Sequence, residues 1–235
     1  MVNLKERSSL KELLDGDDIP FAAIKQNMKE LNTINTFLGG HSITLAGVKG
    51  ILKQLPKNKV ITICEIGCGG GDNLRAIDSW CIKNMIPVQF IGIDIKKECI
   101  DFAKSQCAYL NAKWIQNDYA TVSFGTTNPD IIFSSLFCHH FSNADLVKML
   151  NWMKLNCSKG FFINDLQRHP LAYYSIRWIT QLFSSSYLVK NDAPLSVARS
   201  FVRNEWHALF ETTGIKNYTI QWKWAFRYLI IYSYE

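Results

Sequence analysis

Apolar positions along this chain follow a helical period at first, and later alternate between strand-like runs and helical patterns. Between residues 21 and 38, apolar side chains recur every three or four positions, as on one face of an α-helix. A second helical pattern starts near Thr44 and is expected to end at Pro56, and a shorter amphipathic helix is predicted over residues 4–14. Residues 1–58 are therefore predicted to form a helical leader that packs against the rest of the chain.

Short apolar runs separated by helical patterns predict a layered α/β fold for residues 59–235. The expected strands are residues 60–66, 88–94, 113–117, 130–135, 160–164, 218–224 and 226–234. The last two runs are so close together that they predict a hairpin, and hence an antiparallel pair. We therefore expect a seven-stranded sheet that is mostly parallel, with an antiparallel C-terminal edge pair and with helices on both faces.

Residues 166–201 interrupt this alternation and are predicted to form a helical lid insertion. Apolar and aromatic residues occupy most positions from 170 to 183. This segment is therefore expected either to be buried all round or to cover an apolar ligand. Residues 192–197 follow as a predicted loop.

The composition fits a single cytoplasmic domain. The chain has 235 residues, of which 48% are hydrophobic, and this is enough for a large core. Its seven cysteines are odd in number and include no C-x-x-C pair, which favours reduced thiols in a cytoplasmic protein. Residues 1–16 are charged and lack the apolar stretch of a signal peptide, and no apolar run is long enough to span a membrane.

The charge of the chain does not by itself predict a partner. The net charge of +6 permits RNA binding, but the lysines are distributed over predicted helix faces rather than clustered. No strip of alternating basic and aromatic residues is present in the sequence, so a solvated surface is the simpler interpretation. Nucleic acid is therefore not expected as a partner, and the sequence leaves the oligomeric state open.

A glycine-rich turn follows the first predicted strand, in the sequence Glu65-Ile66-Gly67-Cys68-Gly69-Gly70-Gly71-Asp72. A strand, a bare turn and a helix form the opening unit of a nucleotide-binding sheet, because glycine lets a ligand approach the main chain closely. A dinucleotide site requires a small residue where Asp72 stands, and a carboxylate at this helix N-terminus would repel a diphosphate. An NAD-dependent oxidoreductase is therefore disfavoured.

The two acids that flank the turn favour a ligand with a positive charge and no phosphate, as in S-adenosyl-L-methionine (SAM). The pattern Glu65-x-Gly67-x-Gly69-x-Gly71 resembles motif I of the class I SAM-dependent methyltransferases, which have a Rossmann-like fold. Asp94 follows the last glycine by about twenty residues, where nucleotide-binding folds place a ribose-binding acid. The resemblance implies SAM as cofactor and S-adenosyl-L-homocysteine (SAH) as product. The cofactor contacts that we expect are Glu65, Gly67, Cys68, Gly69, Gly71, Asn73, Asp94 (ribose), Ile95, Asp118 and Tyr119 (adenine), Ser135 and Leu136.

Two adjacent histidines, His139 and His140, follow the fourth predicted strand, where the ligand crevice of an open α/β sheet lies. An acceptor hydroxyl needs a base, and imidazole accepts protons near neutral pH. One histidine, in first place His140, is therefore expected to face the acceptor while the other packs away. An equal alternative is that the pair only shapes the loop and supports the methionine end of SAM. Asp165 and Arg168 are reserve candidates for orienting the acceptor.

No metal is expected in this site. Methyltransferases of the catechol type bind Mg²⁺ through acids at the ends of strands four and five, whereas Ser134 and Ser135 end the fourth predicted strand here. Adjacent histidines are expected to point apart, and the sequence shows no Cys or His cluster that completes a ligand set.

A second resemblance, to a bacterial branch of small-molecule methyltransferases, is carried by residues 164–174, 192–197 and Phe201. It implies a substrate lid that includes Tyr173, Tyr174, Arg177 and Trp178. The chain is therefore predicted to methylate a small, partly aromatic or lipophilic acceptor at oxygen. The alternatives are an RNA or protein methyltransferase and a non-catalytic SAM-binding subunit that activates a partner.

Overall fold

A seven-stranded sheet forms the centre of the molecule. The computed structural model describes residues 2–16, 18–53 and 59–234. The strands are β1 (Ile61–Ile66), β2 (Val88–Asp94), β3 (Ala112–Gln116), β4 (Ile131–Ser135), β5 (Gly160–Leu166), β6 (Tyr218–Lys223) and β7 (Arg227–Ser233). Their order is β3-β2-β1-β4-β5-β7-β6, with β1 to β5 parallel and β7 antiparallel to both β5 and β6. The predicted mostly parallel sheet with an antiparallel C-terminal pair is confirmed.

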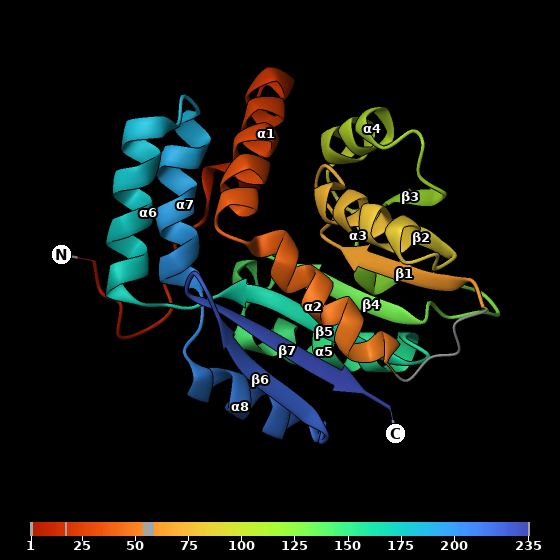
Figure 1. Cartoon of the computed structure of the whole chain (residues 1–235). Helices are drawn as coiled ribbons and strands as arrows, with labels where there is room; N and C mark the ends of the chain where they lie inside the picture. Colours follow the sequence, from red (N-terminus) through yellow and green to blue (C-terminus); the bar gives the residue numbers. More distant parts are fainter. Residues whose placement is uncertain (1, 17, 54–58, 235) are drawn as a thin grey trace.

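Helices cover both faces of the sheet, as predicted (Figure 1). They are α1 (Phe21–Phe37), α2 (Gly40–Leu52), α3 (Asp72–Lys83), α4 (Lys97–Gln106), α5 (Asn143–Asn156), α6 (Pro170–Phe183), α7 (Tyr187–Arg199) and α8 (Arg203–Thr213). Successive side chains of a strand point to opposite faces. Ile61 and Ile63 of β1 therefore join the core under α2 and α3, whereas Cys64 and Ile66 join the core under α5 and α8.

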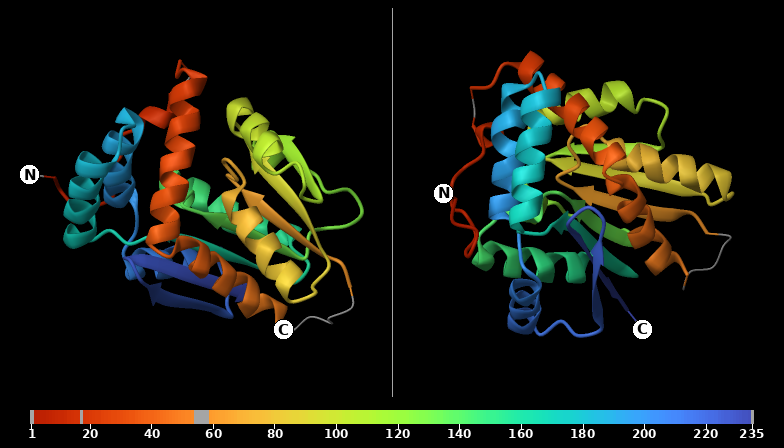
Figure 2. Two further views of the ribbon diagram at one scale, coloured as in Figure 1. Left: turned by 45° about the horizontal axis from the view of Figure 1, so that its top comes forward. Right: turned by 60° about the vertical axis from the view of Figure 1, so that its left-hand side comes forward.

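Three helices stand beyond the carboxyl ends of the parallel strands. The helices α6 and α7 pack against each other, and α1 contacts α7, α2 and α4. Figure 2 shows α1 standing between the α6–α7 pair and α4. The strand order reverses between β1 and β4, and ligands of open α/β sheets bind outside the carboxyl ends at such a reversal. These three helices therefore surround the expected ligand position.

The lid differs from its prediction in two respects. Residues 192–197 are not a loop but part of α7, although Pro194 lies inside that helix and cannot donate a backbone hydrogen bond. Ser186 caps α7, and the burial of apolar residues such as Val189 and Val197 outweighs the local cost of the proline. Of the two alternatives for residues 170–183, burial all round is wrong, because α6 has an exposed outer face, and the alternative that the segment covers an apolar ligand remains.

The first residues form a strap rather than the helix predicted over residues 4–14. We call residues 4–16 the N-terminal strap; within it only the 3-10 turn η1 (Leu13–Asp15) is helical. The strap runs beside α7 (Figure 2, right), and Ser8 N–H donates to the Ala198 carbonyl at 2.9 Å. Guanidinium groups from the body of the protein donate to the Leu4 and Leu10 carbonyls. A helix this short is marginal alone, so these tertiary bonds decide the conformation.

The remaining expectations concern compartment and boundaries. All seven cysteines are free and buried, as predicted for core thiols. Among the described residues, no helix combines the length and the apolar character needed to cross a bilayer. The helix α2 begins at Gly40, earlier than predicted. Its predicted end at Pro56 and the predicted boundary at residue 58 lie outside the described residues.

Candidate active site

A cavity of about 680 Å³ lies over the carboxyl ends of β1, β2 and β4 and extends beneath α1, α6 and α7. One end is formed by the glycine-rich turn and the loops after β2, β3 and β4. The other end is mostly apolar and includes Leu31, Ile34, Leu166, Ile176, Ile179, Trp224 and Phe226. A single space therefore joins a polar nucleotide-like end to an apolar end.

The glycine-rich turn adopts a conformation that glycine favours. The φ angles of Gly67 and Gly69 are +67° and +50°. A Cβ atom on Gly67 would lie 2.3 Å from the Phe137 ring, whereas a Cβ on Gly69 would meet no atom within 4 Å. The turn is fixed to β2 because Cys68 N–H donates to the Ile93 carbonyl at 3.0 Å and Gly69 N–H donates to the Asp94 carboxylate at 2.9 Å. Gly69 thus presents bare main chain to the cavity.

Glu65 is a buried carboxylate with one oxygen unpaired. Its Oε1 accepts a hydrogen bond from Asn73 Nδ2 at 2.8 Å, while no described residue donates to its Oε2. Burial and the nearby charge of Asp72 hold the pKa of Glu65 well above its ordinary value. Buried polar atoms are usually paired, so a free oxygen facing the cavity marks a place for a ligand's donor.

The structure brings most of the expected cofactor residues to one end of the cavity. Its walls include Glu65, Gly67, Cys68, Gly69, Asn73, Asp94, Ile95, Asp118, Tyr119, Ser135 and Leu136. Gly71 lies just behind the wall as the residue that precedes α3, with a φ of +75°. Asp72 is the first residue of α3, at the position where a diphosphate would bind. Asp118 Oδ1 accepts from Ala120 N–H at 3.0 Å, and this bond shapes the turn after β3.

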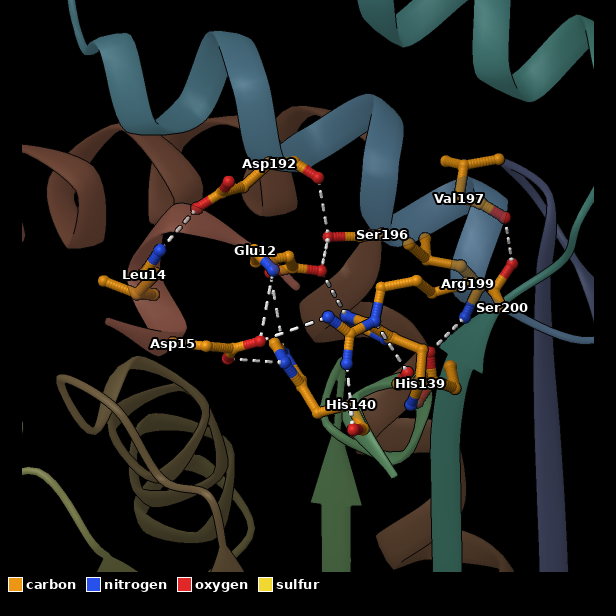
Figure 3. Close-up of polar contacts among 12 residues, drawn as sticks. Glu12, Leu14, Asp15, His139, His140, Asp192, Ser196, Val197, Arg199 and Ser200 are labelled. Carbon is orange, nitrogen blue, oxygen red and sulfur yellow. Dashed lines mark hydrogen bonds and ion pairs between the residues drawn. The ribbon is translucent and has the colours of Figure 1, made fainter. Parts of the chain in front are cut away.

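A chain of histidines and carboxylates borders the cavity between its two ends (Figure 3). His139 and His140 lie in the 3-10 turn η3 (Cys138–His140) after β4. The Nδ1 atom of His139 lies 2.8 Å from Asp165 Oδ1, and its Nε2 lies 3.6 Å from Glu12 Oε1. The Nδ1 atom of His140 lies 3.1 Å from Asp15 Oδ1, and its Nε2 lies 3.7 Å from Glu12 Oε2.

The two imidazoles do not point apart, so that expectation is wrong. Their ring centroids are 4.5 Å apart and their planes differ by 33°. Both rings border the cavity, and both approach Glu12. His139 is 3% exposed and His140 is 22% exposed at the side chain. In the 3-10 turn η3 consecutive side chains are about 120° apart, rather than the 180° of an extended strand, so both rings can approach Glu12.

The strap supplies two of the five residues in this chain of contacts. Ser196 Oγ donates to Glu12 Oε1 at 2.8 Å, and the Asp192 carboxylate accepts from Leu13 N–H and Leu14 N–H. Arg199 pairs with Asp15 at 3.1 Å and donates to the carbonyls of both histidines. Asp192, Ser196 and Arg199 of α7 therefore hold the strap against η3.

Burial and pairing move the carboxyl pKa values in opposite directions. Burial raises the pKa of Glu12. Burial alone would also raise the pKa values of Asp15 and Asp165, but the histidines more than offset it. The hydrogen bond and charge of His140, together with Arg199, lower the pKa of Asp15, and the charge and hydrogen bond of His139 lower that of Asp165. Asp165 and Asp15 are therefore ionised at neutral pH.

Arg168 and the predicted lid residues lie elsewhere. Arg168 is buried outside the cavity wall, pairs with Glu205 at 2.6 Å and donates to the Leu4 carbonyl, so the structure gives it a role in holding the strap. Tyr173 packs in a small core with Ala198. Tyr174, Arg177 and Trp178 lie on the outer face of α6, and the cavity is lined instead by Ala172, Ser175, Ile176 and Ile179.

Sequence reasoning missed Glu12, Asp15 and Arg227 as cavity residues. Glu12 lies in residues 4–14, whose pattern predicted a short amphipathic helix rather than part of a site. Its partner Ser196 is 184 residues away in sequence, so no local spacing connects them.

Comparison with known proteins agrees with this geometry. Residues 63–160, which run from β1 to the start of β5, match the profile of a methyltransferase domain family. Residues 63–160 therefore carry a methyltransferase domain, and the sheet has the fold of class I SAM-dependent methyltransferases. The domain contains the glycine-rich turn, Asp94, Asp118 and both histidines, whereas α1, α6, α7 and the strap lie outside the matched residues.

Solved structures share the fold of this methyltransferase domain at low sequence identity. The plantazolicin methyltransferase BpumL in complex with SAH is 21% identical over 85% of this chain and 72% of its own, with a TM-score of 0.61. Human N-acetylserotonin methyltransferase in complex with SAM is 16% identical over 90% of this chain and 56% of its own, with a TM-score of 0.62. The CurJ carbon methyltransferase is 16% identical over 81% and 53%, with a TM-score of 0.60. No curated protein matches the sequence.

Proposed function

We propose that this protein transfers the methyl group of SAM to an oxygen of a small, partly aromatic or lipophilic acceptor. The observation that carries the proposal is the single cavity that joins the glycine-rich turn to an apolar end, with His139 in its wall and Asp165 bound behind that ring. Methyl transfer needs alignment of acceptor and methyl group and exclusion of water more than it needs acid–base groups. Helices α1, α6 and α7 supply that enclosure.

The residues at the turn fit SAM. SAM supplies an electrophilic methyl group on a sulfonium centre. The unpaired Oε2 of Glu65 suits the ammonium or sulfonium charge, and the open space over Gly69 admits close approach to the main chain. Asp94 suits the ribose hydroxyls, as an acid at the end of β2 does in nucleotide folds. The relatives crystallised with SAH or SAM support this assignment.

We assign the role of base to His139, although the sequence placed His140 first. Asp165 is fully buried, and it binds both the ring Nδ1 and the backbone N–H of His139. With Nδ1 donating to Asp165, Nε2 carries no proton and lies 3.6 Å from Glu12 Oε1, where it can accept the hydroxyl proton of an acceptor that reaches this part of the cavity wall. The partner of His140 is Asp15, which belongs to the strap and is shared with Arg199. Asp165 therefore holds His139 more rigidly than Asp15 holds His140. We assign to His140 only a role in the shape of the cavity wall.

An RNA or protein acceptor and a non-catalytic role in a complex are the alternatives. The apolar end of the cavity supports a small acceptor, since a nucleic-acid site would present basic and aromatic side chains in succession. Seven buried free thiols support a reducing compartment, which we take to be the cytoplasm. Screening of phenolic and other hydroxyl compounds for SAM-dependent methylation tests the proposal, and methylation of RNA alone would reject it.

Replacing Asp94 with alanine is expected to weaken SAM binding about tenfold to a hundredfold. The change leaves two ribose hydroxyls without their acceptor, at a cost of about 1.5–3 kcal/mol. Calorimetric titration of both proteins with SAH measures this change in affinity. Asp101→Ala is the matched control, because it removes the same charge from the exposed side of α4, where Asp101 pairs with Lys97. Equal affinities of wild type and Asp94→Ala, or binding of NAD by the wild type, would reject the assignment.

Activity is expected to be unchanged by EDTA. Glu12, His139 and His140 each place a possible ligand atom within 4.8 Å of the others, so the structure supplies a third candidate ligand that the sequence did not reveal. Ser134 and Ser135, however, end β4 where magnesium-dependent methyltransferases of the catechol type need an acid, and the Nδ1 atoms of the two imidazoles are already paired with Asp165 and Asp15. Rates before and after chelation, with metal analysis of the purified protein, decide the question. Loss of activity that an added divalent ion restores would contradict this prediction.

A further inference from the structure

Arg227 is a buried cation with two donor nitrogens, Nε and Nη1, that have no partner among the described residues. It is the first residue of β7, it is 2% exposed, and its side chain borders the apolar end of the cavity. Among the described residues, none accepts a hydrogen bond from its Nε or Nη1 atoms. Burial lowers the pKa of Arg227 to about 10, and the charge of Asp165 offsets this only in part, so the guanidinium is still charged at neutral pH.

A second unpaired polar group lies beside it. Asn35 of α1 is 5% exposed, borders the same cavity and has no donor for its Oδ1 among the described residues. A Cβ atom on Gly40 would lie 1.7 Å from Asn35 Oδ1 and 2.8 Å from Arg227 Nη1. Asn35 of α1 and Arg227 of β7 are distant in sequence, but their side chains lie close together over the bare main chain of Gly40. Any larger residue at position 40 would displace them.

Leaving two nitrogens of a buried guanidinium unpaired is costly, and an anionic ligand that accepts from them would remove that cost. The planar, forked guanidinium matches a planar anion with two oxygens, and the Asn35 amide adds a donor next to it once its NH₂ group turns toward the ligand. We propose that Arg227 and Asn35 bind a carboxylate group of a ligand in this cavity. The proposal rests on the function proposed above and adds a chemical class to it.

The acceptor is the first source of that carboxylate. Ile176, Ile179 and Trp224 border the same end of the cavity, so a carboxylate at Arg227 would belong to a molecule whose remaining surface is apolar. Such an acceptor is an aromatic or aliphatic acid with a methylatable oxygen. The methionine carboxylate of SAM is the other source of the same chemistry, and it lies on the cofactor rather than on the acceptor. Two titrations distinguish these sources.

The first titration uses 2-naphthoate and its uncharged amide, 2-naphthamide, as probes on protein saturated with SAH. If the acceptor supplies the carboxylate, wild type binds naphthoate at least about tenfold more tightly than naphthamide, because a charge-assisted pair forms only with the acid. Arg227→Met abolishes that preference. Lys223→Met retains it, since Lys223 faces Arg227 on β6, carries the same charge and lies outside the cavity wall.

The second titration compares SAH with 5′-methylthioadenosine, which lacks the amino-acid group. If the cofactor supplies the carboxylate, Arg227→Met weakens SAH at least about tenfold and leaves methylthioadenosine unchanged. A thermal melt of each variant verifies folding. If Arg227→Met does not fold, the naphthoate comparison on wild type and the same two titrations on Asn35→Leu replace it.

A wild type without carboxylate preference, together with variants whose ratio of SAH to methylthioadenosine affinity is unchanged, overturns the proposal. That outcome leaves methyl transfer itself intact if SAH still binds and Asp94→Ala still weakens it. Failure of wild type to bind SAH at all would instead remove the proposed function. The two failures are therefore distinguishable in one set of titrations.

Discussion

Turnover of His139→Gln is expected to fall by about a hundredfold to ten-thousandfold, the usual range for loss of a general base. Glutamine keeps the approximate size of the side chain and a polar atom, but it cannot accept the acceptor's proton at neutral pH. SAH affinity should change no more than a few-fold, because the base acts on the acceptor. Single-turnover rates with an acceptor from the hydroxyl screen, measured beside SAH titrations, separate the two effects.

The pH–rate profile identifies the group more firmly than the rate alone. Wild type should lose activity on the acidic side as the imidazole becomes protonated, and this acidic limb should be absent in His139→Gln. Because His139 lowers the pKa of Asp165, that carboxylate stays ionised across the same range and cannot produce the limb. Asp165→Asn should lower turnover as well, since the ring then loses its anionic partner. His140→Gln is the matched control, and it should keep both the limb and most of the rate.

A base role for His139 would be wrong if both histidine variants kept turnover within a few-fold of wild type. The histidines would then act only on the shape of η3, the alternative that the sequence left open. A large loss in His140→Gln with a small one in His139→Gln would return the base role to His140.

Gly67→Ala is expected to lower the free energy of unfolding by about 2–5 kcal/mol. A residue with a Cβ costs about 1–2 kcal/mol at a left-handed φ, and overpacking in a filled core costs about 1–3 kcal/mol more. The new methyl group would lie 2.3 Å from the Phe137 ring. That ring packs against Phe141 with centroids 4.8 Å apart and against Tyr119 at 6.4 Å, so it has little room to move. Urea denaturation of both proteins measures the difference.

Gly69→Ala is the matched control for that experiment. Gly69 has a similar φ of +50°, but its Cβ would meet no atom within 4 Å. Its stability should therefore fall by only about 1–2 kcal/mol, the backbone term alone. SAH affinity should nevertheless decrease in Gly69→Ala, because the methyl group enters the space proposed for the cofactor. Equal destabilisation by the two substitutions would show that the Phe137 ring yields to the extra atom.

The features that the sequence predicted correctly depend on neighbouring residues. The seven strands, the glycine-rich turn and the position of Asp94 follow from apolar runs and from glycines that are close together in the chain. Burial of a strand on both faces leaves a continuous apolar signal, which is why β1 was placed within one residue of its observed start. Local order of this kind positions the cofactor end of the cavity.

The features that were missed depend on contacts between distant residues. The apolar period of residues 4–14 predicts a helix, in which the backbone carbonyls would accept hydrogen bonds from the same helix. In the structure Arg168 and Arg199 donate to the Leu4 and Leu10 carbonyls instead, and no local pattern predicts these distant contacts. Pro194 gave a local signal for a loop, and the packing of α7 against α6 and the strap outweighed it. The face of α6 that borders the cavity was likewise undetermined, because apolar residues occur on both of its sides.

The strap has a consequence for how the chain folds during its synthesis on the ribosome. Glu12 emerges long before Ser196, its hydrogen-bond partner 184 residues downstream, and before His139. Residues 63–160 can complete much of the sheet while the strap still has no surface to bind. The strap is therefore synthesised before α7 but docks only after it, and contacts of such large sequence separation form slowly. The part of the cavity wall that Glu12 and Asp15 contribute can thus form only after α7 has been synthesised.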